Sequence, residues 1–249
     1  MVGHWPFRKI RAPSFSDLLK VHASNGITCG YVSSLNSVFY NDPFEGDIEL
    51  HDIIGGSGYE HILTVNPTLP GYMDDIETGI KKFNAKGVKI FPGIHGYSLD
   101  SIHMSELCNM LKHFNLPLFI VKELENIRFH YIFVPAIVEM AEIGAFLEKQ
   151  HDLRVLLLSV SFIELSEIKG TLRNHPGVYY DTARLFAIGD IVNELGADRM
   201  VYGSQHPLLC LKSTLLGVKN ADFDDTVKNQ ILETNGYGLI KEGGCLYDY

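Results

Sequence analysis

The sequence lacks the features that mark several classes of protein. No apolar run approaches the roughly 18 residues that a membrane-spanning helix needs. The first residues, Met1–Arg8, have neither the basic nor the long apolar region of a signal peptide. The 21 Lys and Arg are outnumbered by 30 Asp and Glu, which argues against nucleic acid or an anionic membrane as the main partner. We therefore expect a cytoplasmic protein that binds a small molecule, with no nucleic-acid or membrane partner, and leave a homo-oligomer open.

Cysteine is also scarce, and its spacing excludes two further classes. The four cysteines, Cys29, Cys108, Cys210 and Cys245, form no Cys-x-x-Cys pair. A disulfide scaffold or a zinc ribbon would require paired, closely spaced cysteines. We expect four reduced thiols.

The chain does contain a regular alternation of apolar runs and helical patterns. Strands rich in Val, Ile and Leu are expected at residues 28–32, 62–65, 87–91, 116–121, 153–158, 178–181 and 200–202, and the residues before His4 could supply an eighth. Helices are expected at residues 14–26, 74–85, 101–114, 135–150, 162–173, 188–195 and 226–233.

This alternation is typical of parallel strands buried on both faces. We predict an α/β fold, a (β/α)8 TIM barrel formed as one domain over residues 1–249, with room for a shortened first strand. A doubly wound open sheet is the alternative, but the one glycine cluster, Gly55–Gly58, follows no expected strand. We expect that cluster to be a loop rather than a phosphate-binding turn.

The polar residues that follow the expected strands are the candidate site, because barrel enzymes carry their chemistry at the C-terminal strand ends. The candidate catalytic residues are His95, Asp181 and His206. The candidate substrate-binding residues are His4, Trp5, Lys122, Arg128 and Gln205. Each has a structural alternative, such as a salt bridge or a loop hydrogen bond, and Trp5 with Phe7 could plug the mouth of the barrel.

One further charged residue lies inside an expected strand. Lys89 alternates with Val88 and Ile90, so it should face the other side of its strand from both of them. In a barrel this could place Lys89 in the interior, paired with a carboxylate. We expect its role to be structural.

Three motifs give the chain a resemblance to a known family. They are Gly3-His-Trp-Pro-Phe-Arg8, the run from Gly87 to Tyr97, and Val178-Tyr-Tyr-Asp181 followed by Gly196–Ser204. Together with a closing helix at residues 228–235, they resemble the amidohydrolase-related (amidohydrolase 2) family of metal-dependent TIM-barrel hydrolases, which includes aminocarboxymuconate-semialdehyde decarboxylase. The resemblance covers nearly the whole chain and implies a barrel fold.

The family's metal ligands are not found where the resemblance places them. The family holds its metal with a His-x-His pair after strand one, a His after each of strands five and six, and an Asp after strand eight. The second His of the pair falls on Met1, the next two on Val121 and Ser159, and the Asp on Gln205. None of these is a good ligand for a divalent ion. We expect no metal cofactor of the family type; a zinc site built from His4, His95, His130 and His206 is the disfavoured alternative.

Two functions remain open on this basis. The first is a hydrolase or decarboxylase of a small polar compound, which could carry a carboxylate, acting without the usual metal centre. The second is a non-catalytic barrel that binds a small molecule or assembles with a partner. The surviving His, Asp, Lys and Arg favour the first, and the lost ligands favour the second.

Overall fold

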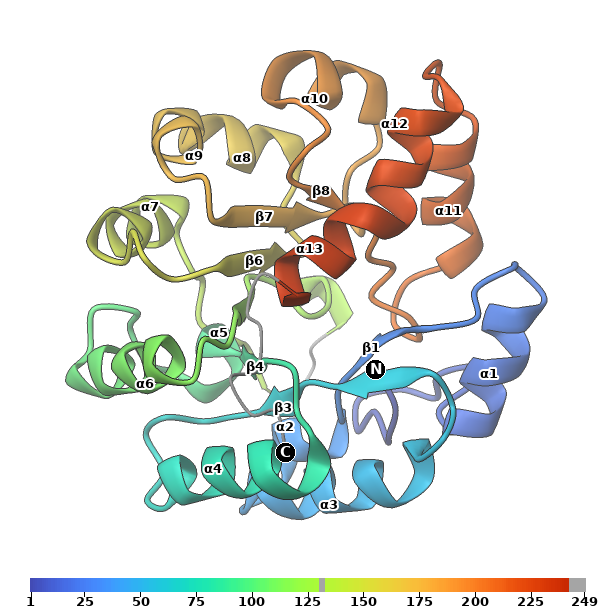
Figure 1. Ribbon diagram of the computed structural model, residues 1–249. Helices are drawn as coiled ribbons and strands as arrows, with labels where there is room; N and C mark the ends of the chain where they lie inside the picture. The colour runs from blue at the N-terminus through green and yellow to red at the C-terminus, as the bar shows by residue number, and fades with distance from the viewer. Residues whose placement is uncertain (130–132, 242–249) are drawn as a thin grey trace.

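The protein is a TIM barrel, with parallel strands inside and helices outside (Figure 1). The computed structural model describes residues 1–129 and 133–241. The strands are β1 (Gly30–Val32), β2 (Tyr59–His61), β3 (Leu63–Thr64), β4 (Val88–Ile90), β5 (Leu118–Val121), β6 (Val155–Leu158), β7 (Val178–Asp181) and β8 (Met200–Val201).

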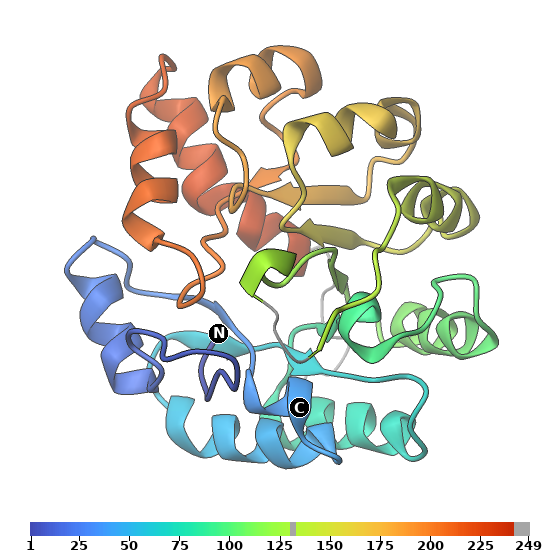
Figure 2. The ribbon, with the colours of Figure 1, turned by 180° about the vertical axis from the view of Figure 1, so that it is seen from behind.

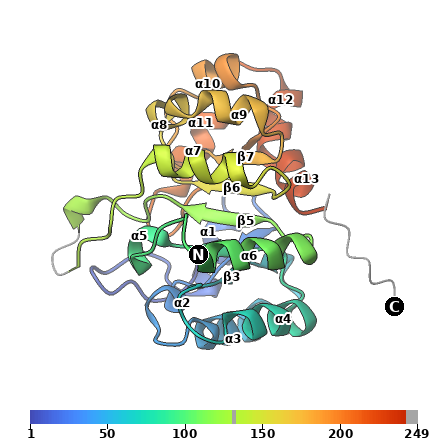
Figure 3. The ribbon, with the colours of Figure 1, turned by 90° about the vertical axis from the view of Figure 1, so that its left-hand side faces the viewer.

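Helices connect the strands and form the outer layer, which Figure 3 shows from the side of α6 (Ile102–His113) and α7 (Met140–Lys149). The others before β6 are α1 (Phe15–Ala23), α2 (Asn36–Phe39), α3 (Pro43–Ile54), α4 (Tyr72–Phe83), α5 (Pro92–His95) and the 3-10 turn η1 (Ile127–Phe129). After β6 come α8 (Phe162–Glu167), α9 (Lys169–Asn174), α10 (Ile188–Leu195), α11 (Leu211–Lys219), α12 (Asp225–Asn229), the π-helical η2 (Gln230–Thr234) and α13 (Asn235–Lys241).

The strands follow one another around the barrel in chain order. Strands β3 to β8 form one parallel ladder, and β1 pairs in parallel with β2. β2 and β3 are two halves of one strand that changes neighbour at Ile62, because the Ile62 N–H donates to the Val32 carbonyl and the Leu63 N–H donates to the Gly87 carbonyl. A single parallel bridge from Val2 to Ser34 supplies a short first strand. The predicted barrel with a shortened first strand is confirmed.

Contacts between distant parts of the chain lie next to β8. The Met1 nitrogen donates to the His206 carbonyl at 2.7 Å. Beside β8 (Figure 1), α13 begins at Asn235, whose side-chain amide donates to the carbonyls of Ala197 and Met200. The Tyr31 hydroxyl of β1 donates to the Gly236 carbonyl at 3.2 Å. The start of α13 is thereby bound to both β1 and the approach to β8.

Alternating residues of each strand face either the helices or the barrel interior. Val88 and Ile90 pack in the large apolar core beneath the helices. Lys89, between them, pairs in register with Phe119 of β5, which belongs to a separate interior apolar cluster. The prediction that Lys89 faces away from Val88 and Ile90 is confirmed, because strand side chains alternate.

Among the helices of eight residues or more, α3 and α11 were not predicted, and two of the predicted helices have other bounds. No helix was expected between residues 32 and 62, but α3 begins at Pro43 behind the capping carboxylate of Asp42, which accepts from the Phe44 N–H at 3.0 Å. Its Gly46 is required for packing, since a Cβ there would lie 2.5 Å from the Ser37 nitrogen. α11 was also missed. The helix expected at 135–150 begins only at Met140, and the one at 162–173 is broken in two around Ile168.

The remaining expectations about local structure concern loops, thiols and helix length. Gly55–Gly58 lies between α3 and β2, so the prediction of a loop is confirmed. Cys29, Cys108 and Cys210 are free thiols, while Cys245 lies outside the described residues. Within the described part of the chain, no helix combines the length and apolarity needed to cross a bilayer.

Candidate functional site

A cavity of about 820 Å³ lies within the barrel and between the helices that flank β1 and β8. Its upper end, at the C-terminal ends of the strands, is lined by Ser159, Asp181 and Gln205. Its lower end reaches residues at the N-terminal ends of the strands, such as Lys86 and Asn115. Residues of α1, α11 and α13 complete the lining. A cavity of this volume is large enough for a small organic ligand.

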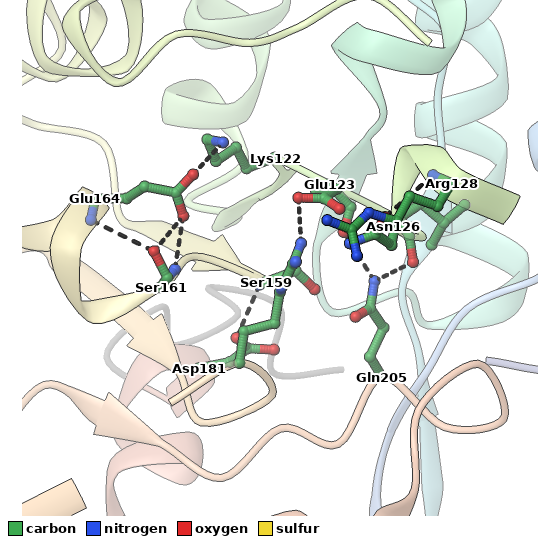
Figure 4. A network of polar contacts seen from close by, with 11 residues as sticks. Lys122, Glu123, Asn126, Arg128, Ser159, Ser161, Glu164, Asp181 and Gln205 are labelled. Atoms are coloured by element: carbon green, nitrogen blue, oxygen red, sulfur yellow. Dashed lines mark hydrogen bonds and ion pairs between the residues drawn. The ribbon is translucent and has the colours of Figure 1, made fainter. Parts of the chain in front are cut away.

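Asp181 is the buried carboxyl group at the upper end. It is the last residue of β7 and only 3% exposed. Its Oδ1 accepts from the Ser159 N–H at 2.9 Å (Figure 4) and from the Ala183 N–H at 3.4 Å. Burial raises the pKa of Asp181 to about 6, against the opposing effect of these hydrogen bonds and of the Lys89 charge. Asp181 can therefore exchange a proton near neutral pH.

Gly203 leaves the space that Asp181 occupies. A Cβ at Gly203 would lie 2.7 Å from both Cβ and Oδ2 of Asp181. We expect Gly203→Ala to displace the Asp181 carboxyl and to lower the free energy of unfolding by about 1–3 kcal/mol, as measured by chemical denaturation. The matched control is Gly217→Ala on α11, where the nearest atom is 4.0 Å away and no loss of stability is expected. A Gly203→Ala protein as stable as the wild type would contradict the argument.

Lys89 is the buried cation of the cavity. The residue is 9% exposed, and its Nζ donates to the Ser33 hydroxyl at 3.2 Å. The Nζ also lies 5.5 Å from the centre of the Phe91 ring. Burial lowers the pKa of Lys89 to about 8, and the charge of Asp181 opposes this shift. At neutral pH the ammonium and the Asp181 carboxylate are both largely charged.

Ser159 and Gln205 complete the upper end, and both have left-handed backbone conformations, with φ of 62° and 48°. The Ser159 hydroxyl is buried and has no hydrogen-bond partner among the described residues. The Gln205 amide nitrogen donates to the carbonyls of Glu123 at 3.0 Å and Leu124 at 2.6 Å (Figure 4). Gln205 thereby ties the loop after β8 to the loop after β5.

Two histidines line the cavity beside β1. The rings of His22 and His206 are 5.8 Å apart, and the Nδ1 of His22 is 2.6 Å from the Tyr59 hydroxyl. Within the described chain, the Nε2 of each ring is buried without a partner. Burial lowers the pKa of both side chains to about 4, so both are neutral at pH 7.

The C-terminal mouth of the barrel is filled by a mouth cluster, which we define as Trp5, Phe7, Phe39, Phe91 and Leu208. Trp5 is 1% exposed, and its ring is 5.3 Å from Phe7 and 5.4 Å from Phe39, edge to face. Figure 2 shows the first residues and the loop after β5 on this face of the ring of strands. This packing is consistent with the plug that was the alternative for Trp5 and Phe7, and the substrate-binding role suggested for Trp5 stays a prediction.

The structure brings together only some of the candidate residues. Asp181, His206 and Gln205 line the cavity, whereas His95 is not among its described lining residues. His95 ends α5, with its Nε2 3.0 Å from the Val38 carbonyl oxygen, and burial lowers its pKa.

The remaining candidates lie elsewhere on the C-terminal side. Lys122 forms an ion pair with Glu164 (Figure 4). His4 and Arg128 are exposed. The roles suggested for all of these residues stay predictions.

Lys89 was not among the candidate site residues, although it lines the cavity. A lysine within the apolar strand run Gly87–Phe91 was the available signal, because an ammonium is buried in such a run only at considerable cost. The Ser159 hydroxyl and His22 carried no comparable signal.

The residues at the upper end do not fit the metal centre that the resemblance implies. Met1, Val121, Ser159 and Gln205 all line the cavity, but none offers a carboxylate or an imidazole. Among residues 1–129 and 133–241, no group of three His, Cys, Asp or Glu lies close enough to hold a metal ion. His130, named with His4, His95 and His206 as an alternative zinc site, lies outside the described residues.

The class that this structure defines is the TIM-barrel fold, and solved TIM-barrel structures are similar to the chain. An uncharacterised TIM-barrel protein of Bordetella bronchiseptica has a TM-score of 0.73 at 16% identity, covering 93% of this chain and 84% of its own. A putative amidohydrolase of Staphylococcus aureus has a TM-score of 0.68 at 13% identity, covering 92% and 93%.

A third similar structure is a decarboxylase. It is the 5-carboxyvanillate decarboxylase of Novosphingobium aromaticivorans, complexed with manganese and 4-hydroxy-3-methoxy-5-nitrobenzoic acid, with a TM-score of 0.69 at 17% identity, covering 90% of this chain and 79% of its own. No family profile and no curated protein sequence matches the chain. The resemblance indicated by the motifs is confirmed at the level of the fold.

Proposed function

We propose that this chain is an enzyme that decarboxylates or hydrolyses a small carboxylate-bearing compound inside the barrel, without a metal centre of the family type. The observation that carries the proposal is Asp181, a buried carboxyl group at a strand end that borders a cavity of ligand size. Its pKa of about 6 suits a group that gives or takes a proton near neutral pH.

The similar structures support the reaction class, but only through their fold. The Novosphingobium aromaticivorans enzyme is a decarboxylase, and the ligand in its structure carries a carboxyl group on an aromatic ring. That structure also contains manganese, whereas the matched positions of this chain lack metal ligands. The proposed reaction therefore relies on groups of the chain itself.

Asp181 is proposed as the general acid of a decarboxylation. The C–C bond to the carboxylate breaks, carbon dioxide leaves, and the electron pair stays on the substrate carbon. That carbon then takes the proton of the Asp181 carboxyl, and the Asp181 carboxylate is reprotonated from solvent. In a hydrolysis, the Asp181 carboxylate would instead accept a proton from the attacking water.

The proposal is tested by incubating the full chain with a panel of small aromatic and aliphatic carboxylates in the presence of a chelator, and by measuring carbon dioxide release and ester or amide cleavage. We expect turnover of at least one compound, reduced about 100-fold or more by Asp181→Asn, which is the usual size of a general acid–base contribution. Turnover that requires added zinc or manganese would overturn the metal-free part. If no compound is turned over, the proposal that the chain is an enzyme is overturned.

A second candidate is a barrel that binds a small carboxylate without turning it over. The observation that favours it is the mouth cluster, which fills the position where barrel enzymes admit their substrates. This function predicts saturable binding of a carboxylate in the same panel, without product, in wild type and Asp181→Asn alike.

A further inference from the structure

The metal positions of the resemblance and the buried cation of the chain lie in the same cavity. Met1, Val121, Ser159 and Gln205 line it together with Lys89. A divalent ion in such a barrel would provide positive charge at the upper end of the cavity. Three described lysines line the cavity of this chain. Lys89 lies in the middle of β4, whereas Lys86 lies in a loop and Lys219 ends α11.

The Lys89 ammonium has hydrogen-bonding capacity left over. An ammonium has three N–H donors. Among the described residues, Nζ donates one hydrogen bond, to the Ser33 hydroxyl at 3.2 Å. An ammonium that is nine-tenths buried is costly unless charged or polar acceptors surround it. A ligand anion would supply the acceptors that the protein provides only in part.

Asp181 does not supply the missing hydrogen-bond acceptors of the Lys89 ammonium. Its charge acts on Lys89, but the hydrogen bonds recorded for its Oδ1 come from the backbone N–H groups of Ser159 and Ala183. Directly beside it, the Ser159 hydroxyl is 1% exposed as a residue and has no partner within the described chain. The Ser159 backbone N–H thus contacts Asp181, and the charge of Asp181 acts on Lys89. Lys89 keeps N–H donors beyond its bond to Ser33, and the Ser159 hydroxyl keeps its own.

We propose that the Lys89 ammonium and the Ser159 hydroxyl together bind a carboxylate group of a small ligand, and that Lys89 takes the place of the metal ion as the positive charge of the cavity. The ligand carboxylate accepts from the free N–H groups of Lys89 and from the Ser159 O–H. The apolar wall of the cavity, which includes Phe119 and Leu156, receives the apolar body of the ligand. The class of ligand is therefore an aromatic or aliphatic monocarboxylate.

The inference deepens the proposed function, but binding alone is enough to test it. The probes are benzoate and naphthoate, each compared with its neutral amide, titrated calorimetrically into the full chain with a chelator present. We expect the acids to bind about tenfold or more tightly than the amides, because a hydrogen bond to a charged group is stronger than one to a neutral group.

Three variants locate the binding site. Lys89→Met keeps the length of the side chain and removes its charge, and we expect it to weaken binding of the acids about tenfold or more. Ser159→Ala removes a hydroxyl that has no partner in the described chain, so folding should be kept while binding of the acids falls several-fold. The control is Lys212→Met, because Lys212 is an exposed residue of α11 and is not among the described residues that line the cavity; it should bind as the wild type does.

The outcomes separate this inference from the proposed function. The carboxylate site would be overturned if acids and amides bound equally, or if Lys89→Met and Ser159→Ala bound the acids as the wild type does. It would also be overturned if binding appeared only after metal was added, or if neither acid bound at millimolar concentration. If carboxylate binding depends on Lys89 but no compound is turned over, the carboxylate site is supported and the proposed enzymatic function is overturned. Turnover that is unaffected by Lys89→Met supports the enzyme and overturns the site.

Discussion

Replacing Asp47 with alanine is expected to lower the free energy of unfolding by about 2–4 kcal/mol, a large effect for one residue of α3. Asp47 is 1% exposed, and its Oδ1 lies 2.9 Å from the His61 Nε2 while its Oδ2 accepts from the Thr64 N–H at 3.0 Å. Removing the carboxylate leaves two buried donors without an acceptor. Part of this loss is offset, because burial raises the pKa of Asp47 and its charge is therefore costly to bury.

Asp47 contacts the two strand segments on either side of Ile62. His61 ends β2 and Thr64 ends β3, so Asp47 holds both sides of the break at Ile62. Thr64 also pairs in register with Lys89, which connects this helix to the wall of the cavity. If β3 shifts in Asp47→Ala, the affinity for a ligand bound by Lys89 should therefore fall.

Two comparisons make this prediction specific. Asp47→Asn keeps an oxygen for the Thr64 N–H and should lose less stability than Asp47→Ala. Asp52→Ala, at an exposed position of the same helix, should change stability by no more than about 0.5 kcal/mol in urea denaturation. Equal stability of Asp47→Ala and Asp52→Ala would show that the buried pair contributes nothing.

The fold was predictable because its signals are local. The run at 178–181 is followed by helix α10 and the apolar residues of β8, and the repetition of this alternation along the chain indicates parallel strands. The alternation of Val88, Lys89 and Ile90 likewise predicted which side chain faces inward. The missed helix α3 contains Gly46, a residue that disfavours helices in isolation but is required by the close approach of Ser37.

The site was only partly predictable, because its shape depends on distant contacts. Asp181 could be predicted, since it ends a strand and strand ends meet at one rim. The contact that holds Trp5 could not, because its hydrogen-bond acceptor, Glu125, is 120 residues away in the chain. His95 was assigned to the same rim, but its bond to the Val38 carbonyl joins it to α2, 57 residues earlier. Spacing along a sequence does not determine such contacts.

Replacing Glu125 with alanine is expected to loosen the mouth cluster. Glu125 is 7% exposed, and its Oε2 accepts from the Trp5 ring N–H at 2.9 Å. Its Oε1 accepts from the Arg8 Nε at 2.6 Å, and Arg8 also donates to the Leu208 carbonyl at 3.4 Å. One carboxylate thus connects the first residues, the loop after β5 and the loop after β8.

The expected loss of stability in Glu125→Ala is about 2–4 kcal/mol, most of it from the loss of the buried hydrogen bond between Glu125 and the Trp5 ring N–H. The Arg8 ion pair contributes less, because the Arg8 side chain is 37% exposed and its charge is screened by water. Glu125→Gln keeps an acceptor for Trp5 and loses only the charge, so its stability should lie between those of the alanine variant and the wild type.

Trp5 is the single tryptophan of the chain and therefore reports on this change directly. In the wild type its ring is 1% exposed, so its emission should be blue-shifted and protected from acrylamide. In Glu125→Ala we expect a red shift and stronger quenching, whereas Glu167→Ala, at an exposed position of α8, should leave both unchanged. Val121 and Leu124 contact the mouth cluster on one side and line the cavity on the other, so opening the cluster should also speed ligand exchange. Unchanged emission and quenching in Glu125→Ala would mean that apolar packing alone holds Trp5 in place.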